Sequence, residues 1–303
     1  MFRPMSLVKD LPIGAAANAS AGGGIGIVKC FRPAPLSDVV EAIWDCDIPD
    51  PSFAKALTIK CAPGTSLWLM GQYRTPAEVR HGTQLLPIKC ATQIQSQTVT
   101  VHPKGALGLL VVCLRSDAAS RIVEAPLREF VDANIHLGGL FGSREVATCD
   151  DMLASARTSK ERLSGIHSFL LQRIRPQTDS LANRAALHLR RNPTMQMHSI
   201  ATKLDVSTRH LSRAFNAAFG TSPKRFARLA RFQRILAERR NGQSWAQIAY
   251  ACGLTDQAHL IREFQDIVGA SPTDFFTHEL RIDATAASEA SLIVQHRIAA
   301  SQI

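Results

Sequence analysis

The sequence lacks several features that would place it in an exported or membrane-bound class. No apolar run approaches the roughly 18–20 residues that a membrane-spanning helix needs. The first residues, MFRPMSLVKDLPIG, contain no apolar stretch ahead of the small residues GAAANASAGGG, so we expect no secretory signal. These two absences predict a cytoplasmic protein with no membrane partner.

Closely spaced cysteine pairs are also missing. The chain has seven scattered cysteines and no CxxC motif, so a zinc ribbon or a thioredoxin-type site is not expected. An odd number of thiols with no export signal favours reduced cysteines that pack as small hydrophobic side chains. A redox sensor acting through Cys46, Cys61, Cys90 or Cys113 is the alternative.

Charge is unevenly distributed along the chain. The net charge is +10, and residues 180–280 hold 14 Lys and Arg against 7 Asp and Glu, whereas the rest holds 21 against 18. A concentrated basic segment indicates a polyanionic partner, with nucleic acid first and a membrane surface second. A basic surface that only keeps the protein soluble is the alternative.

The first half of the chain has the pattern of strands. Residues 1–26 are rich in Gly, Ala and Ser and are predicted to be a flexible lead-in. The segments SQTVTVH (96–102) and LGLLVVCL (107–114) suit strands, and glycine-containing breaks separate further short segments. We therefore predict a small antiparallel barrel or sandwich.

The second half has the pattern of helices. We predict the following segments in order: helices near 118–124, 126–136 and 151–174, a linker over 175–180, an almost entirely helical region over 181–278, and an Ala/Ser-rich tail over 279–303. The tail is expected to be mobile or weakly helical. The fold class is thus α+β.

A repeat dominates the last third of the chain. The stretch TRHLSRAFNAAFGTSPKRF (208–226) returns as QAHLIREFQDIVGASPTDF (257–275). Seven identities recur at a constant spacing of 49: His210/His259, Leu211/Leu260, Arg213/Arg262, Phe215/Phe264, Gly220/Gly269, Ser222/Ser271 and Pro223/Pro272. Upstream, Ile200-Ala201 returns as Ile248-Ala249. A repeat of this length predicts one structural unit built twice.

Each copy predicts a helix-turn-helix. A short helix, a tight turn and a second helix follow one another, and the second helices are expected over 208–219 and 257–268. Ser207 is placed to cap the first of these helices, and Gly220 follows its last apolar residue, where a left-handed residue is favoured. Ser244 and Gln247 match a capping box in the second copy. A long helix over 223–240 joins the two units.

Polar side chains are predicted to cover the outer faces of both second helices. They are Thr208, Arg209, Ser212 and Arg213 in the first copy, and Gln257, His259 and Arg262 in the second. Arg can bond guanine with two donors and Gln can bond adenine, so these helices suit base edges in a major groove. An ordinary helical bundle with solvated polar faces is the alternative.

The joining helix adds seven cations: Lys224, Arg225, Arg228, Arg231, Arg234, Arg239 and Arg240. Arg228 and Lys224 are the candidates for phosphate contacts, which add affinity without reading sequence.

These motifs resemble the AraC/XylS family of bacterial transcription regulators. The stretches IATKLDVSTRHLSRAF, GTSPKRF, IAYACGLTDQAHLIREF and GASPTDFF carry the resemblance, which covers roughly 181–278. It implies a seven-helix domain whose two recognition helices enter successive major grooves of double-stranded DNA. By position it assigns base contacts to Arg209, Ser212 and Arg213, and to Gln257, Ala258, His259 and Arg262. Ala258 departs from the polar residue often found there, and Ile261 is also apolar. The second helix is therefore expected to read a thymine methyl or to read less.

Residues 27–176 resemble the sensor half of a less studied branch of the same family. WxxD (44–47) and LRSDAASRIVEAPLREFVDANIHL (114–137) carry this resemblance. It implies a cupin-like barrel with trailing, dimerising helices, a small-molecule effector of unknown identity and self-association as a homodimer. RNA polymerase is a further candidate partner, and the expected location is the cytoplasm, in association with the nucleoid.

We expect no enzymatic activity, no cofactor and no metal. A metal-dependent cupin enzyme needs clustered ligands, such as two histidines with one residue between them, whereas His81, His102 and His136 are isolated. A cupin-type enzyme whose C-terminal domain targets it to DNA is the less favoured alternative.

Overall fold

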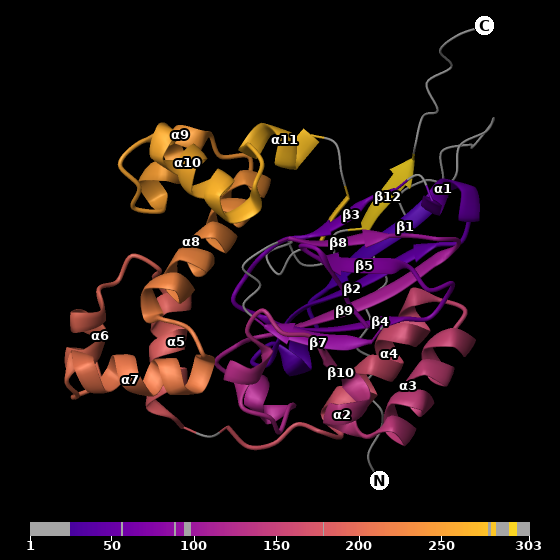
Figure 1. Ribbon diagram of the computed structural model, residues 1–303, viewed down its shortest axis with the longest axis horizontal. Helices are drawn as coiled ribbons and strands as arrows, with labels where there is room; N and C mark the ends of the chain where they lie inside the picture. Colours follow the sequence, from indigo (N-terminus) through magenta and orange to yellow (C-terminus); the bar gives the residue numbers. More distant parts are fainter. Residues whose placement is uncertain are drawn as a thin grey trace, which may run out of the picture.

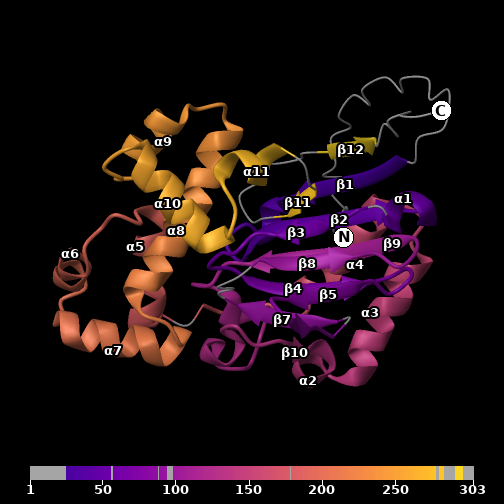
Figure 2. The same ribbon diagram turned by 45° about the horizontal axis from the view of Figure 1, so that its top comes forward.

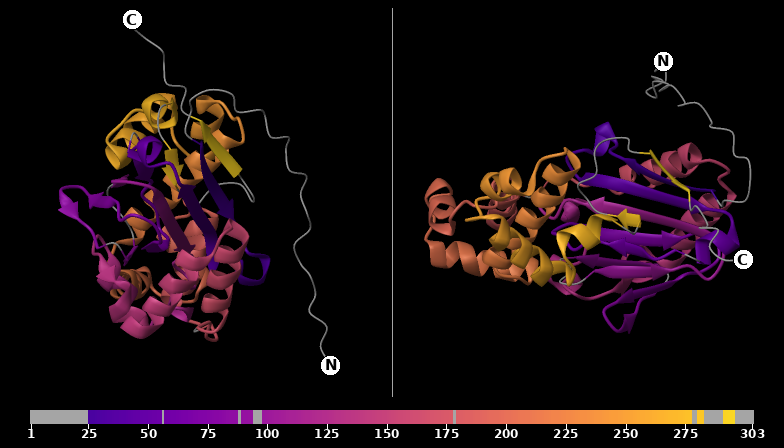
Figure 3. Two further views of the ribbon diagram at one scale, coloured as in Figure 1. Left: turned by 90° about the vertical axis from the view of Figure 1, so that its right-hand side faces the viewer. Right: turned by 90° about the horizontal axis from the view of Figure 1, so that it is seen from above.

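The computed structural model describes residues 25–55, 57–87, 89–93, 98–177, 179–277, 280–282 and 291–295. A sheet-rich half and a helical half lie at opposite ends of an elongated molecule (Figure 1). The view from above in Figure 3 shows the same division, with the helices α5–α10 at one end. Most of the predicted flexible lead-in lies outside the described residues, but its last two residues already belong to the first strand.

Two sheets make up the N-terminal half. The first has the order β10-β7-β4-β9-β2-β1-β12, and the second has the order β11-β3-β8-β5-β6. The strands of the first sheet are β1 Ile25–Phe31, β2 Val40–Ile48, β4 Leu67–Gln72, β7 Cys90–Gln93, β9 Leu107–Leu114, β10 Ile135–His136 and β12 Ser291–Gln295. Those of the second are β3 Ile59–Cys61, β5 Glu78–His81, β6 Gln84–Leu85, β8 Val99–His102 and β11 Leu280–Ile282.

Side chains alternate between the two faces of each strand, and those on one face form a core between the two sheets. On β2, Trp44 and Cys46 point into a cluster that also holds Val99 and Val101 of the second sheet. Ile43 belongs instead to the core on the other face of the first sheet. Every residue of β9 is buried, because this central strand is covered on both faces. That burial explains its uninterrupted apolar sequence.

Helices cover the outer face of the first sheet. They are α2 Leu137–Phe141, α3 Ser143–Ser155 and α4 Ser159–Leu171, while the short α1 Pro51–Lys55 follows β2. The predicted helix over 151–174 is wrong as a single element, because the chain leaves the helix after Ser155 and Thr158 caps a new one. The Thr158 hydroxyl accepts the amide N–H of Glu161 at 3.2 Å.

The helices predicted near 118–124 and 126–136 are also wrong in extent. The chain forms only the 3₁₀ turns η2 Ala119–Arg121 and η3 Leu127–Phe130 there, and a third turn, η1, lies at Ala34–Leu36. Pro126 starts η3 without a side-chain cap, and Asp132 has φ +49°, so the backbone cannot continue as a helix.

The helical half follows the predicted pattern closely. Its elements are α5 Leu181–Arg191, α6 Met197–Lys203, α7 Thr208–Phe219, α8 Pro223–Arg240, α9 Trp245–Ala251, α10 Gln257–Val268 and α11 Pro272–Thr277. The bounds of α7, α8 and α10 are those that the repeat predicted. The described residues contain no helix that is both long enough and apolar enough to span a membrane.

The C-terminal tail differs from its prediction. β11 pairs in parallel with β3, and β12 pairs antiparallel with β1, so both sheets gain a strand from the end of the chain. Figure 2 shows these two strands returning to the sheets beyond α11. The prediction of a mobile or weakly helical tail is therefore wrong for these two segments. The short apolar run SLIVQ suits a strand.

Candidate nucleic-acid interface

The first helix-turn-helix consists of α6, a tight turn and α7. Asp205 occupies the turn with φ +54°, a left-handed conformation that a short polar side chain tolerates. The Ser207 hydroxyl accepts the amide N–H of His210 at 3.2 Å and so caps α7. Leu211, Phe215 and Phe219 are completely buried on one face of α7. Their burial fixes the opposite face toward solvent.

The predicted base-contacting residues of α7 lie on that solvent face. Arg209 and Arg213 are exposed, and Thr208 and Ser212 are half-buried beside them. Neither arginine forms an ion pair within the part of the chain that the structure describes. Both guanidinium groups are therefore available to a partner, in the N-terminal half of the helix where a major-groove reader places its contacts.

The second helix-turn-helix, α9 and α10, repeats this construction. Ser244 and Gln247 form the predicted capping box, with the Ser244 amide donating to Gln247 Oε1 at 2.9 Å. Gly253 takes the left-handed turn position, with φ +68°, that Asp205 takes in the first unit. The Asp256 carboxylate caps α10 by accepting the amide N–H of His259 at 2.7 Å.

A cluster of aromatic rings holds α10 in place. Phe264 contacts Phe232 of α8 and Phe275 of α11, with ring centres 5.1 and 5.2 Å apart. On the opposite face, Gln257, Ala258 and Arg262 are exposed and His259 is half-buried. All the residues predicted to contact bases are thus on outer faces of α7 and α10. Ala258 is the apolar residue among them.

Most cations of α8 already have partners. Arg228 pairs with Asp266 at 3.1 Å and with Glu263 at 3.7 Å, and Arg231 pairs with Glu263 at 2.7 Å. Glu263 is only 6% exposed, so this ion pair lies between α8 and α10. Arg228 therefore holds the second unit against α8, and a phosphate would have to compete with Asp266 for it. Lys224 is exposed near the start of α8.

The sequence pattern did not reveal these pairs. Glu263 lies beside Arg262 on α10, and the fold shows that Glu263 points inward, toward α8. Arg225 likewise pairs with Asp132 of the N-terminal half at 3.0 Å. Arg234 pairs with Glu238 at 3.7 Å. The Arg239 guanidinium lies 4.7 Å from the ring centre of Trp245.

Polar contacts join α5 and α8 to the N-terminal half. Arg190 bridges Glu41, at 2.7 Å, and Asp117, so that one guanidinium binds two carboxylates of the N-terminal half. Burial alone would raise the pKa of Asp117, but the attraction of Arg190 and Arg115 outweighs it and holds that pKa below its usual value. The Thr65 hydroxyl also donates to Oε1 of Gln233, a buried residue of α8, at 2.9 Å.

The segment around η3 contacts the C-terminal end of α7. Arg128 Nη1 donates to the carbonyl oxygen of Ala217 at 3.3 Å. Gly220, the left-handed C-cap of α7, lies against the backbone of Arg128, and a β-carbon on Gly220 would meet its Cα and carbonyl oxygen at 3.0 Å. The N-terminal half therefore contacts the C-terminal end of α7 and leaves Arg209 and Arg213 near its N-terminal end exposed.

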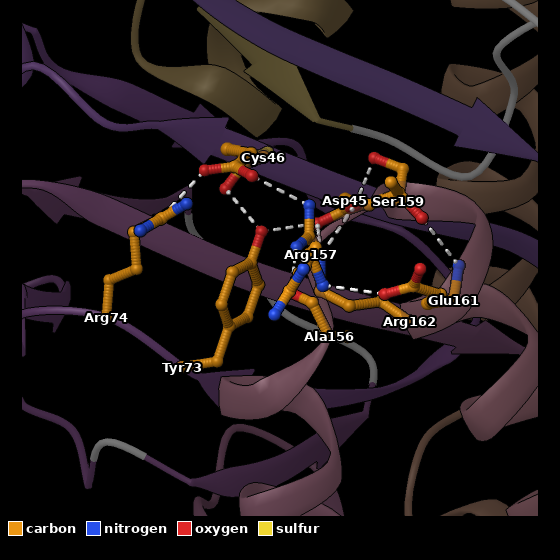
Figure 4. A network of polar contacts seen from close by, with 11 residues as sticks. Asp45, Cys46, Tyr73, Arg74, Ala156, Arg157, Ser159, Glu161 and Arg162 are labelled. Atoms are coloured by element: carbon orange, nitrogen blue, oxygen red, sulfur yellow. Dashed lines mark hydrogen bonds and ion pairs between the residues drawn. The ribbon is translucent and has the colours of Figure 1, made fainter.

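A buried charge network ties α4 to β2 (Figure 4). The Arg162 side chain, 2% exposed, binds Asp45 at 3.1 Å and Asp47 at 2.7 Å. Tyr73 donates its hydroxyl to Asp45 at 2.6 Å, and Ser159 donates to the same carboxylate. Asp47 is the last residue of the WxxD motif. The sequence therefore marked one partner of this network but gave no sign of Arg162.

The cysteines do not favour the redox alternative. Six of the seven are buried, and Cys149 is the one that is partly accessible. Burial raises the pKa of Cys90 to about 12 and raises that of Cys46 well above its ordinary value. A thiol kept protonated and away from solvent is a poor target for oxidants. The described residues also contain no group of three or more His, Cys, Asp or Glu side chains arranged to hold a metal.

Comparison with known proteins gives one family. A model described as a helix-turn-helix domain matches residues 200–278. No curated protein matches the chain.

Solved structures give only weak likenesses. ToxT from Vibrio cholerae is 11% identical, with 72% of this chain and 96% of that chain covered and a TM-score of 0.43. A DNA-binding transcriptional dual regulator from Escherichia coli K-12 is 22% identical, with coverage of 33% and 93% and a TM-score of 0.30. The AraC-like transcriptional activator CuxR is 10% identical, with coverage of 70% and 81% and a TM-score of 0.26. At such TM-scores these likenesses decide nothing about this chain.

The family match covers both units, α6–α7 and α9–α10, and it lies within the region whose motifs predicted the same assignment. The chain therefore carries a helix-turn-helix domain of the AraC type over residues 200–278.

Proposed function

We propose that this protein is a sequence-specific, DNA-binding transcription regulator that reads two major-groove segments with α7 and α10. One observation carries the proposal: both helices present exposed arginines, Arg209 and Arg213 on α7 and Arg262 on α10, that form no ion pair among the described residues. Arg213 and Arg262 are the same position of the repeat. Two such helices fixed to one joining helix suit two grooves of a single duplex.

Base reading is assigned residue by residue. Arg209, Arg213 and Arg262 suit guanine, and Gln257 suits adenine, while Thr208, Ser212 and His259 supply single hydrogen bonds. Ala258 offers only apolar contact, which fits a thymine methyl. Lys224 is the better candidate for a phosphate contact, because Arg228 is already bound to Asp266.

The N-terminal half is proposed to control this domain in response to a small molecule. The contacts of Arg190, Gln233 and Arg128 join the two halves directly. An effector acts through them only if it binds the two arrangements of the halves with different affinity. Self-association as a homodimer and contact with RNA polymerase belong to the same proposal.

Binding to DNA tests the central proposal. Fluorescence anisotropy of the full chain with its own upstream DNA, beside a scrambled duplex and over a salt series, separates base reading from phosphate attraction. We expect tighter binding to the native duplex and a steep loss of affinity as salt rises. Equal binding to both duplexes and to operator candidates selected from random DNA would contradict a sequence-specific reader.

A further inference from the structure

An apolar cavity lies between the first sheet and its covering helices. Leu69, Gly71 and Leu110 form its floor, and Leu137 and Phe141 of α2 are among the residues that cover it. The core between the two sheets, by contrast, holds the buried side chains of Trp44, Trp68 and Met70.

A missing side chain on β4 creates part of this space. Leu67 and Leu69 face the helices, and Gly71 follows in the same alternation. A β-carbon on Gly71 would meet no atom within 4 Å. Glycine weakens a strand and is often found where something else approaches the backbone. Its partner across the sheet, Leu110, has the ordinary side chain that Gly71 lacks.

The lining selects the chemistry of a guest. Asp150 is the charged residue among the lining residues, and it already pairs with Lys89. Arg173 lies over the Phe169 ring at 3.7 Å and pairs with Glu145, but it does not line the cavity. A carboxylate would enter without a free cation to bind, which is costly in an apolar site. The lining therefore favours a small uncharged molecule, such as a single aromatic ring.

Room for a ring requires a movement of the cover. The cavity has a volume of about 50 Å³, larger than the roughly 10–15 Å³ that one water needs and smaller than the roughly 150 Å³ of an engineered cavity that binds benzene. α2 is suited to move, because it has no fully buried residue and is followed by Gly142, whose φ is +87°. The other walls are α3, α4 and the sheet.

The same cover is continuous with the segment that holds α7. Arg128 and Asp132, which contact α7 and α8, precede β10 and α2 within ten residues of chain. A displacement of Leu137 and Phe141 would reach the residues that contact Gly220 and Arg225 along this stretch of backbone, through β10 and its pairing with β7.

We infer that the cavity beneath α2 is the effector site, that it takes a small uncharged apolar molecule, and that occupancy loosens the hold of residues 128–132 on α7. The ligand site stands by itself, whereas its effect on DNA rests on the proposed function.

Toluene and benzoate form a matched pair of probes, because they share a ring and differ in a methyl group against a carboxylate. Isothermal titration calorimetry and thermal unfolding of the full chain measure binding. Toluene should bind at least about tenfold more tightly than benzoate and should raise the unfolding temperature. Gly71→Val should fill the cavity, raise the unfolding temperature without ligand and weaken toluene binding at least about tenfold. Thr100→Val on β8 of the second sheet is the control and should bind toluene as the wild type does.

DNA affinity measured with and without toluene tests the connection. Saturating toluene should raise the affinity for the preferred duplex by about fivefold or more in the wild type and leave Gly71→Val unchanged. Failure of toluene to bind, or equal binding by Gly71→Val, would overturn the site. Toluene binding with unchanged DNA affinity would overturn the connection to α7. Toluene binding in a protein with no preferred duplex would leave the site standing and remove the proposed function.

Discussion

Gly220 and Gly269 provide an internal comparison, because they occupy the same position in the two copies of the repeat. Each ends the second helix of its unit in a left-handed conformation, with φ +63° and +75°. The surroundings differ. A β-carbon at Gly269 meets nothing within 4 Å, whereas one at Gly220 meets Arg128 Cβ at 2.9 Å and its Cα and carbonyl oxygen at 3.0 Å. Alanine at the two positions therefore imposes the same backbone strain but different contacts.

The magnitudes follow from these two contributions. A left-handed alanine costs about 1–2 kcal/mol, so Gly269→Ala should lower the free energy of unfolding by that amount. Gly220→Ala adds overpacking against a backbone that cannot rotate away, which costs about a further 1–3 kcal/mol. Urea unfolding followed by the helical circular dichroism signal measures both variants, and both sites lie in the same helical domain.

Relief of the clash has two routes. If α7 remains in contact with η3, the whole overpacking cost of Gly220→Ala lowers the urea midpoint of unfolding. If the two halves separate instead, the extra cost is limited to the free energy of their contact and the hydrodynamic radius increases. Equal midpoints for the two variants, with no increase in radius, would refute the described contact between Arg128 and Gly220.

Three other predictions follow from particular contacts. Arg213→Ala or Arg262→Ala should each weaken binding to the preferred duplex by about 1–3 kcal/mol and reduce sequence preference, and anisotropy that shows neither effect would refute the placement of that helix. Arg162→Met should lower the free energy of unfolding by about 3–5 kcal/mol, because Asp45 is left buried without its cation; a loss below about 1 kcal/mol in urea unfolding would mean that the carboxylate finds water. Since the pKa of Asp117 lies below its unfolded value of about 3.9, the stability it gives with Arg190 is present above that pH and is lost as pH falls through the folded pKa. Asp117→Asn should therefore destabilise the protein at pH 7 and lose that difference in acid, and a pH-independent difference would contradict the ion pair.

The helical domain could be predicted from the sequence because its signals are local. Capping residues such as Ser207, left-handed glycines such as Gly220 and an apolar stripe of period 3.6 all lie within one helix length of each other. The repeat supplied a second, independent reading of each signal. The outward face of α7 then followed from Leu211 and Phe215 alone.

The N-terminal half could not be predicted to the same depth, because its decisive contacts are distant in sequence. Arg162 and Asp45 are separated by 117 positions, and Arg190 and Glu41 by 149. No local pattern shows that such residues meet. The sequence likewise could not show that Gly71 leaves space in a cavity, because that depends on α2 lying over β4.

The distribution of thiols makes the folded protein open to selective chemical labelling. Cys149 is partly accessible and lines the cavity, whereas the other six cysteines are buried. Burial raises the pKa of Cys149 to about 11, so its reaction with a maleimide should be slow at neutral pH and faster in mild alkali. A fluorophore attached there in the native state would report the environment beneath α2 without any engineered cysteine. The same chain would then serve as an optical sensor for its own guest.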